Sequence, residues 1–148
     1  MALKMRFLYF SKKPQMKQLA AAIKTEFELT ENNNATDIIP PAYPCNNERL
    51  VIIGISGKNE LDDMVRRFCS QLDKKAAQNV AVLIDGDAKL LENTIDVLKA
   101  AGTNVIDNTK LVKFGGLPFI GGKLTEAETK EYLDWAHAIV DKIGRAHV

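Results

Sequence analysis

The stretch LVIIGI, residues 50–55, decides the fold class, because it is apolar along its whole length with no polar alternation. A strand of this kind is covered on both faces, as the central strands of parallel sheets are. The stretch VAVLI, residues 80–84, has the same character. A segment with helical apolar spacing separates the two, which predicts a βαβ unit.

The same alternation extends toward both ends of the chain. Upstream, residues 5–10 and 36–39 predict a first strand and a short second strand, and Pro40 and Pro41 place the second strand at an edge because neither can donate to a ladder. Downstream, residues 103–106 begin a last strand, which residues 110–114 either extend or supplement. Helices are predicted from apolar stripes that contain Met16 to Phe27, Leu61 to Leu72, Leu91 to Leu98 and Tyr132 to Ile143.

The order of these elements predicts an α/β domain that spans residues 1–148. The connection between the second and third strands shows no helical pattern, and residues 31–48 are rich in Asn and Pro, so we expect a loose crossover there. Right-handed parallel connections place helices on both faces of the sheet, and ligands bind beyond the carboxyl ends of the strands. The loops at residues 11–17, 54–59 and 85–88 are therefore the candidate ligand loops.

Composition excludes several classes of partner. The chain has 148 residues and a formal net charge of +1, which argues against nucleic acid and anionic membranes as partners. No apolar run approaches the roughly 20 residues of a membrane helix. The 2 cysteines form no C-x-x-C pair, so we expect reduced thiols and a cytoplasmic protein.

Motifs of several enzyme classes are absent. The glycine-rich residues 116–124 fail the phosphate-loop pattern because Gly122 stands between the second glycine and the lysine, and Leu124 follows it. Neither Cys45 nor Cys69 has the arginine six residues later that a low-molecular-weight phosphatase requires. His137 and a histidine near the C-terminus are predicted to lie on the surface and form no metal site or catalytic triad. No catalytic residue is predicted.

The strands and loops described so far resemble those of the flavodoxin family of FMN-binding electron carriers. The likeness covers nearly the whole chain, from the strand at residues 5–10 through Ser11 into a helix, the stretches at 50–54 and 80–84, and the last helix around residues 132–136. It implies a flavodoxin-like, doubly wound, five-stranded parallel sheet of order 2-1-3-4-5 with helices on both faces. It also implies FMN as cofactor, electron transfer without protein catalytic residues, and a redox or protein partner that the sequence does not identify.

The resemblance assigns the cofactor contacts to the three loops. In the family, a T/S-x-T-G-x-T loop holds the FMN phosphate, and residues 11–16 stand at that place here. The implied contacts are Ser11, Lys12, Lys13, Gln15 and Met16 in the first loop, Ser56, Gly57, Lys58 and Asn59 in the second, and Asp85, Gly86 and Asp87 in the third.

Differences between these three loops and those of the flavodoxin family support a second hypothesis. Pro14 replaces the glycine and Met16 replaces the last hydroxyl, and the loops at 54–59 and 85–88 contain no aromatic residue to stack on a flavin. The alternative is a flavodoxin-fold protein that has lost FMN and acts as a binding or interaction module. Such a module could hold a different anion at Lys12 and Lys13.

Overall fold

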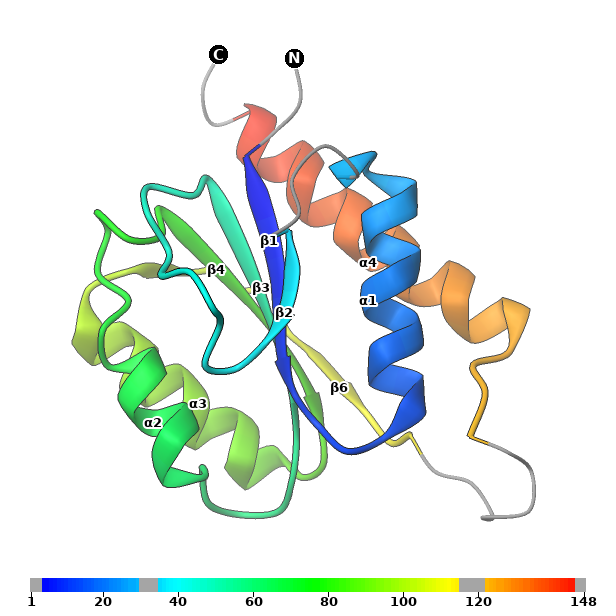
Figure 1. The fold of residues 1–148 in the computed structure, drawn as a ribbon, viewed down its shortest axis with the longest axis horizontal. Helices are drawn as coiled ribbons and strands as arrows, with labels where there is room; N and C mark the ends of the chain where they lie inside the picture. Colours follow the sequence, from blue (N-terminus) through cyan, green and yellow to red (C-terminus); the bar gives the residue numbers. More distant parts are fainter. Residues whose placement is uncertain (1–3, 30–34, 115–121, 146–148) are drawn as a thin grey trace.

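A parallel sheet with helices on both faces organises the computed structural model, which describes residues 4–29, 35–114 and 122–145 (Figure 1). Every strand pairing in this part of the chain is parallel. The strands are β1 (Met5–Phe10), β2 (Thr36–Ile38), β3 (Leu50–Ser56), β4 (Asn79–Asp85), β5 (Asn104–Val105) and β6 (Lys110–Val112). The helices are α1 (Pro14–Glu26), α2 (Asp63–Cys69), α3 (Ala88–Ala101) and α4 (Glu126–Arg145).

The strand order is β2-β1-β3-β4-β5, which confirms the predicted flavodoxin-like topology. β5 pairs with the first residues of β4, and β6 pairs with its last residues, from Leu83 to Asp85. The two short strands therefore share the fifth position. The sequence left open whether residues 110–114 extend the last strand or supplement it. In the structure, residues 110–112 extend it after an interruption at residues 106–109.

Alternate side chains of the strands serve two separate cores. Phe7 and Ile52 point to the face that α1 and α4 cover, whereas Leu8 and Ile53 point to the face that α2 and α3 cover (Figure 1). All four side chains are fully buried. Burial on both faces explains why the sequence of β3 has no polar alternation.

Local signals fix the ends of the helices. Pro14 opens α1, where its missing N–H is not needed. The carboxylates of Asp62 and Asp87 accept backbone N–H groups at the starts of α2 and α3. Gly102 ends α3 with a φ of 111°, a left-handed conformation that favours glycine. At the start of α4, Thr125 and Glu128 exchange hydrogen bonds of 3.0 Å and so form a capping box.

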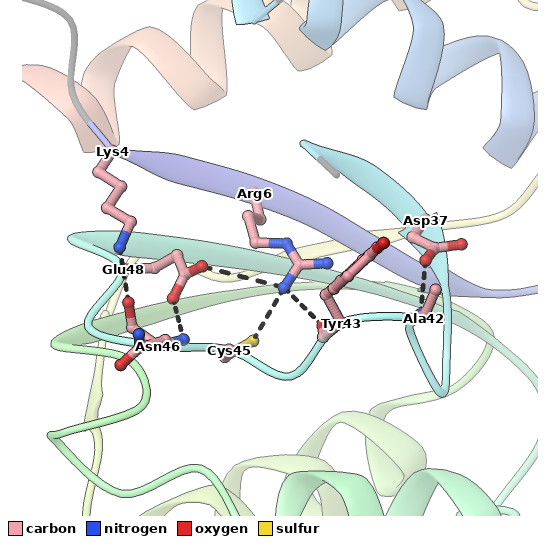
Figure 2. Close-up of polar contacts among 8 residues, drawn as sticks. All are labelled: Lys4, Arg6, Asp37, Ala42, Tyr43, Cys45, Asn46 and Glu48. Atoms are coloured by element: carbon pink, nitrogen blue, oxygen red, sulfur yellow. Dashed lines mark hydrogen bonds and ion pairs between the residues drawn. The ribbon is translucent and has the colours of Figure 1, made fainter. Parts of the chain in front are cut away.

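The crossover from β2 to β3 contains no helix, as predicted, and a buried arginine holds it to the sheet (Figure 2). Arg6 is only 2% exposed on the face that α2 and α3 cover. Its Nη1 donates to the Tyr43 carbonyl oxygen at 2.9 Å and lies 3.9 Å from Glu48 Oε1. Glu48 in turn accepts the backbone N–H of Asn46. The crossover thus supplies carbonyl and carboxylate groups where a helix would supply an apolar stripe.

Some sequence predictions fall outside the described residues. These are the first residues of the Asn- and Pro-rich segment, 31–34, and most of the glycine-rich residues 116–124. Within the described part, Trp135 is 7% exposed and its indole N–H donates to the Asn108 carbonyl oxygen at 2.9 Å, so its ring packs in the core. None of the described helices has the length and apolar character needed to cross a membrane.

Candidate functional site

The three candidate loops meet at the carboxyl edge of the sheet. Strands β1, β3 and β4 are neighbours and parallel, so the residues that follow them lie side by side. Ser11 Oγ is 2.7 Å from Ser56 Oγ, and Ser56 Oγ donates to Asp85 Oδ2 at 2.8 Å. The predicted convergence of the three loops is confirmed.

Asp85 is the centre of a polar network that joins these loops to the end of β6. Its side chain is 2% exposed, and Oδ2 lies 2.8 Å from Lys13 Nζ. Oδ1 accepts the backbone N–H of Phe114 at 2.8 Å. Lys13 Nζ also donates to the Phe114 carbonyl oxygen at 2.7 Å. The buried carboxylate therefore has an opposite charge and two neutral donors, the arrangement that makes burial of a charge tolerable.

Several hydrogen-bond donors of the first loop are engaged within the protein. Because the Ser56 hydroxyl donates to Asp85, its lone pair accepts the Ser11 hydroxyl. Ser11 Oγ accepts the backbone N–H of Lys13 at 3.0 Å. The next residue, Pro14, has no N–H. The Ser11 hydroxyl, the Lys13 N–H and the Lys13 ammonium are thus engaged within the protein, and Pro14 offers no donor.

Backbone contact draws the second and third loops together. Gly57 N donates to the Asp85 carbonyl oxygen at 3.1 Å. A Cβ atom added at Gly86 would overlap the Gly57 carbonyl oxygen, so only glycine fits at residue 86. Asp87, which caps α3, also accepts the backbone N–H of Asn59 at 3.1 Å. Both carboxylates of the third loop are therefore used to hold loops in place.

The loops enclose a cavity of about 860 Å³. Apolar side chains from the ends of β1, β2 and β6 form part of its wall, and the polar network described above lies at its floor. The volume is within the roughly 300–1,000 Å³ of small-molecule sites. The lining residues from the strand ends are Tyr9, Phe10, Ile38, Ile39 and Phe114.

Most of the loop residues singled out from the sequence line this cavity. They are Ser11, Lys12, Lys13, Ser56, Gly57, Lys58, Asp85, Gly86 and Asp87. Gln15 and Met16 lie outside it: Met16 is fully buried against Gly54 and Phe7, and Gln15 is 6% exposed beside Gly122. Asn59 also lies outside and contacts Asp87 and Asn93. Thus the first turn of α1 packs inward.

Sequence reasoning missed the apolar wall. The search for aromatic residues covered the second and third loops, whereas the aromatic side chains of the cavity come from β1 and from the residue pair after β6. The signal was the sequence YF at residues 9–10, directly before Ser11. Burial raises the pKa of the Tyr9 hydroxyl, and Asp37 adds to the rise, so Tyr9 is neutral at neutral pH.

Comparison with known proteins assigns no family. The chain matches no protein-family model, and no curated protein is similar to it in sequence. The structure shows the flavodoxin-like α/β topology and a cavity at the edge of the sheet where such folds bind ligands.

Proposed function

We propose that the chain is a flavodoxin-fold binding domain whose cavity takes a planar, mainly apolar small molecule without an FMN-type phosphate cradle. The observation that carries this proposal is the ion pair between Lys13 and Asp85, together with the hydroxyl chain from Ser11 through Ser56 to Asp85. These contacts engage internally the Ser11 and Ser56 hydroxyls and the Lys13 ammonium, which a phosphate in this loop could otherwise use.

The energetic cost of breaking the ion pair between Lys13 and Asp85 supports the proposal. If Lys13 turned to a ligand phosphate, it would leave a carboxylate that is 2% exposed with neutral donors only. Loss of one partner from a buried ion pair costs about 3–5 kcal/mol. Lys13 is itself 45% exposed, which puts the cost near the lower end of that range. Such a penalty removes most of what a phosphate contact would contribute.

The wall of the cavity favours a flat apolar ligand. Ile38 is 55% exposed at the cavity, and Phe10 is partly exposed there. Covering such side chains contributes about 25 cal/mol for each Å² of apolar surface removed from water. The remaining lone pairs of the Ser11 and Ser56 hydroxyls can accept hydrogen bonds that orient a ligand in such a site.

A neutral fluorescent probe tests the proposal. Phenylnaphthylamine is planar and uncharged, and we expect saturable binding to the wild-type chain at one site. The Ile38→Asp variant should weaken this binding roughly tenfold, because it places a charge in the apolar wall. Met64→Asp is the matched control, since Met64 is 48% exposed on α2 and outside the cavity. Absence of saturable binding, or equal binding by both variants, would contradict the proposal.

FMN binding with electron transfer is the second candidate function. The place of the cavity at the ends of β1, β3 and β4 favours it, as do the partly exposed Tyr9 and Phe10, whose rings can contact an isoalloxazine. In that case the cofactor would supply the redox chemistry, and the protein would position it. A cytoplasmic location and an unidentified redox or protein partner stay predictions under both candidates.

Retention of FMN separates the two candidates. The chain is mixed with excess FMN at tens of micromolar and passed over a desalting column. The first candidate predicts a colourless protein fraction and unquenched flavin fluorescence. A yellow protein fraction with the absorbance of oxidised flavin would replace the first candidate with the second.

A further inference from the structure

We infer that three lysines at the rim of the cavity select an anionic ligand, so that the planar molecule carries a carboxylate, sulfonate or phosphate group. This inference rests on the proposed binding function and narrows it to one chemical class. The lysines are Lys12 in the loop after β1, Lys58 in the loop after β3, and Lys113 after β6. All three line the cavity and all three are exposed.

Positive charge is concentrated at this end of the molecule. The whole chain has a formal net charge of only +1. The residues around the cavity include four lysines but only two aspartates. The parallel topology causes this grouping, because residues after neighbouring parallel strands emerge at the same edge of the sheet.

The two aspartates offset the positive charge of the lining only in part, because four lysines and two aspartates leave a net charge of +2. Asp85 is paired with Lys13, so these two charges compensate each other at the floor of the cavity. Asp87 accepts backbone N–H groups of Leu90 and Asn59 at the start of α3. In the described part of the chain, no ion pair involves Lys12, Lys58 or Lys113.

The rim and the floor therefore present different chemistry to a ligand. Ile38 and Phe10 offer apolar surface to the cavity, and Lys12, Lys58 and Lys113 line it with exposed side chains. A neutral planar molecule would use the wall alone. A planar anion would use the wall and the rim together, with its charged group directed outward. The anion is held by exposed lysines, not by a backbone cradle, so its charge matters more than its geometry.

Two probes with the same aromatic body test the inference. Anilinonaphthalene sulfonate carries one negative charge, and phenylnaphthylamine lacks the sulfonate. Each is titrated onto the wild-type chain and onto a variant with Lys12→Gln, Lys58→Gln and Lys113→Gln. An exposed ion pair contributes about 0.2–1 kcal/mol, so we expect the triple variant to bind the sulfonate roughly tenfold more weakly. Its binding of phenylnaphthylamine should change less than about twofold.

A matched control removes the same charge elsewhere. Lys74→Gln, Lys75→Gln and Lys99→Gln lie near the opposite end of the sheet and outside the cavity, and this control should bind both probes as the wild type does. Unchanged sulfonate binding by the rim variant, or an equal loss in both triple variants, would overturn the inference while the proposed function stands. If neither probe binds the wild type, the proposed function fails and the inference with it.

Discussion

Lys13 Nζ lies 2.8 Å from Asp85 Oδ2, so the first loop of the chain is tied to the end of the fourth strand. Both residues were selected from the sequence as ligand contacts. Their pairing gives them a structural role at the floor of the cavity, where Asp85 also binds Ser56 and Phe114. It explains how an aspartate can be buried at the edge of the sheet.

Loss of Lys13 should therefore destabilise the fold. We expect Lys13→Ala to lower the free energy of unfolding by about 3 kcal/mol, because it leaves the buried Asp85 carboxylate without an opposite charge. Lys13→Ala combined with Asp85→Asn should lose less than the sum of the single variants. Lys12→Ala is the control and should change stability by less than about 0.5 kcal/mol. Urea unfolding compares the wild type with these four variants, Asp85→Asn included, and strict additivity would show that the pair has no energetic coupling.

The close approach of Gly57 and Gly86 predicts unequal effects of two glycine substitutions. Gly86→Ala should destabilise the chain by about 2 kcal/mol or more, because the new Cβ would overlap the Gly57 carbonyl oxygen. A Cβ at Gly57 meets only Leu90 Cδ2 at 3.4 Å, so Gly57→Ala should cost less than about 1 kcal/mol. Thermal unfolding followed by circular dichroism compares them. Equal melting temperatures would contradict the observed spacing of the two loops.

The buried Arg6, which contacts the crossover, should contribute more to the stability of the fold than the exposed Lys4. Arg6→Ala removes the contacts to Tyr43 and Glu48 and leaves a carboxylate that is 6% exposed without its cation. We expect a loss of about 3 kcal/mol. Lys4 also binds the crossover, through the Asn46 carbonyl oxygen, but it is exposed, so Lys4→Ala should cost less than about 1 kcal/mol. Chemical denaturation measures the free energy of unfolding of the two variants. Equal losses in Arg6→Ala and Lys4→Ala would refute the assigned role of Arg6.

Burial of Cys69 predicts a loss of stability at alkaline pH. Burial raises the pKa of this thiol from its ordinary value of 9.0 to about 12. Between these values the unfolded chain releases the thiol proton while the folded chain retains it, so stability falls as the pH rises from 9 toward 12. Cys69→Ala should show a shallower fall over this range in urea unfolding. Burial also raises the pKa of Tyr132 to about 12, so Tyr132→Phe serves as the comparison. An unchanged slope in Cys69→Ala would contradict the prediction.

The sequence predicted the sheet well because its central strands are unbroken apolar runs. β1 was predicted with its observed bounds, and β3 and β4 within one or two residues at their ends. The break between β5 and β6 was left open, because polar residues at 107–109 could either end a strand or interrupt it. Pairing of both segments with β4 is a tertiary property that local patterns do not encode.

The candidate site was predicted only in part, for a related reason. A strand followed by a serine and a glycine indicates a loop at the ligand edge, so Ser56 and Gly57 were found. The partnership of Lys13 with Asp85 joins two distant segments, and no local pattern reveals it. Met16 was transferred from a family loop by position, although the helical stripe that contains it already placed it in the core. The walls formed by Tyr9 and Phe114 belong to strand ends, where apolar residues are ordinarily assigned to packing.

The most direct test of the central claim is a map of the backbone amides that respond to a bound planar molecule. The account predicts that saturating phenylnaphthylamine shifts the amide resonances of Lys12, Ser56, Gly57, Gly86 and Lys113, which belong to separate segments around one cavity. Amides near the opposite end of the sheet, such as those of Lys75 and Gly102, should remain in place. Shifts confined to that opposite end, or spread evenly over the chain, would contradict the assignment of this cavity as the binding site.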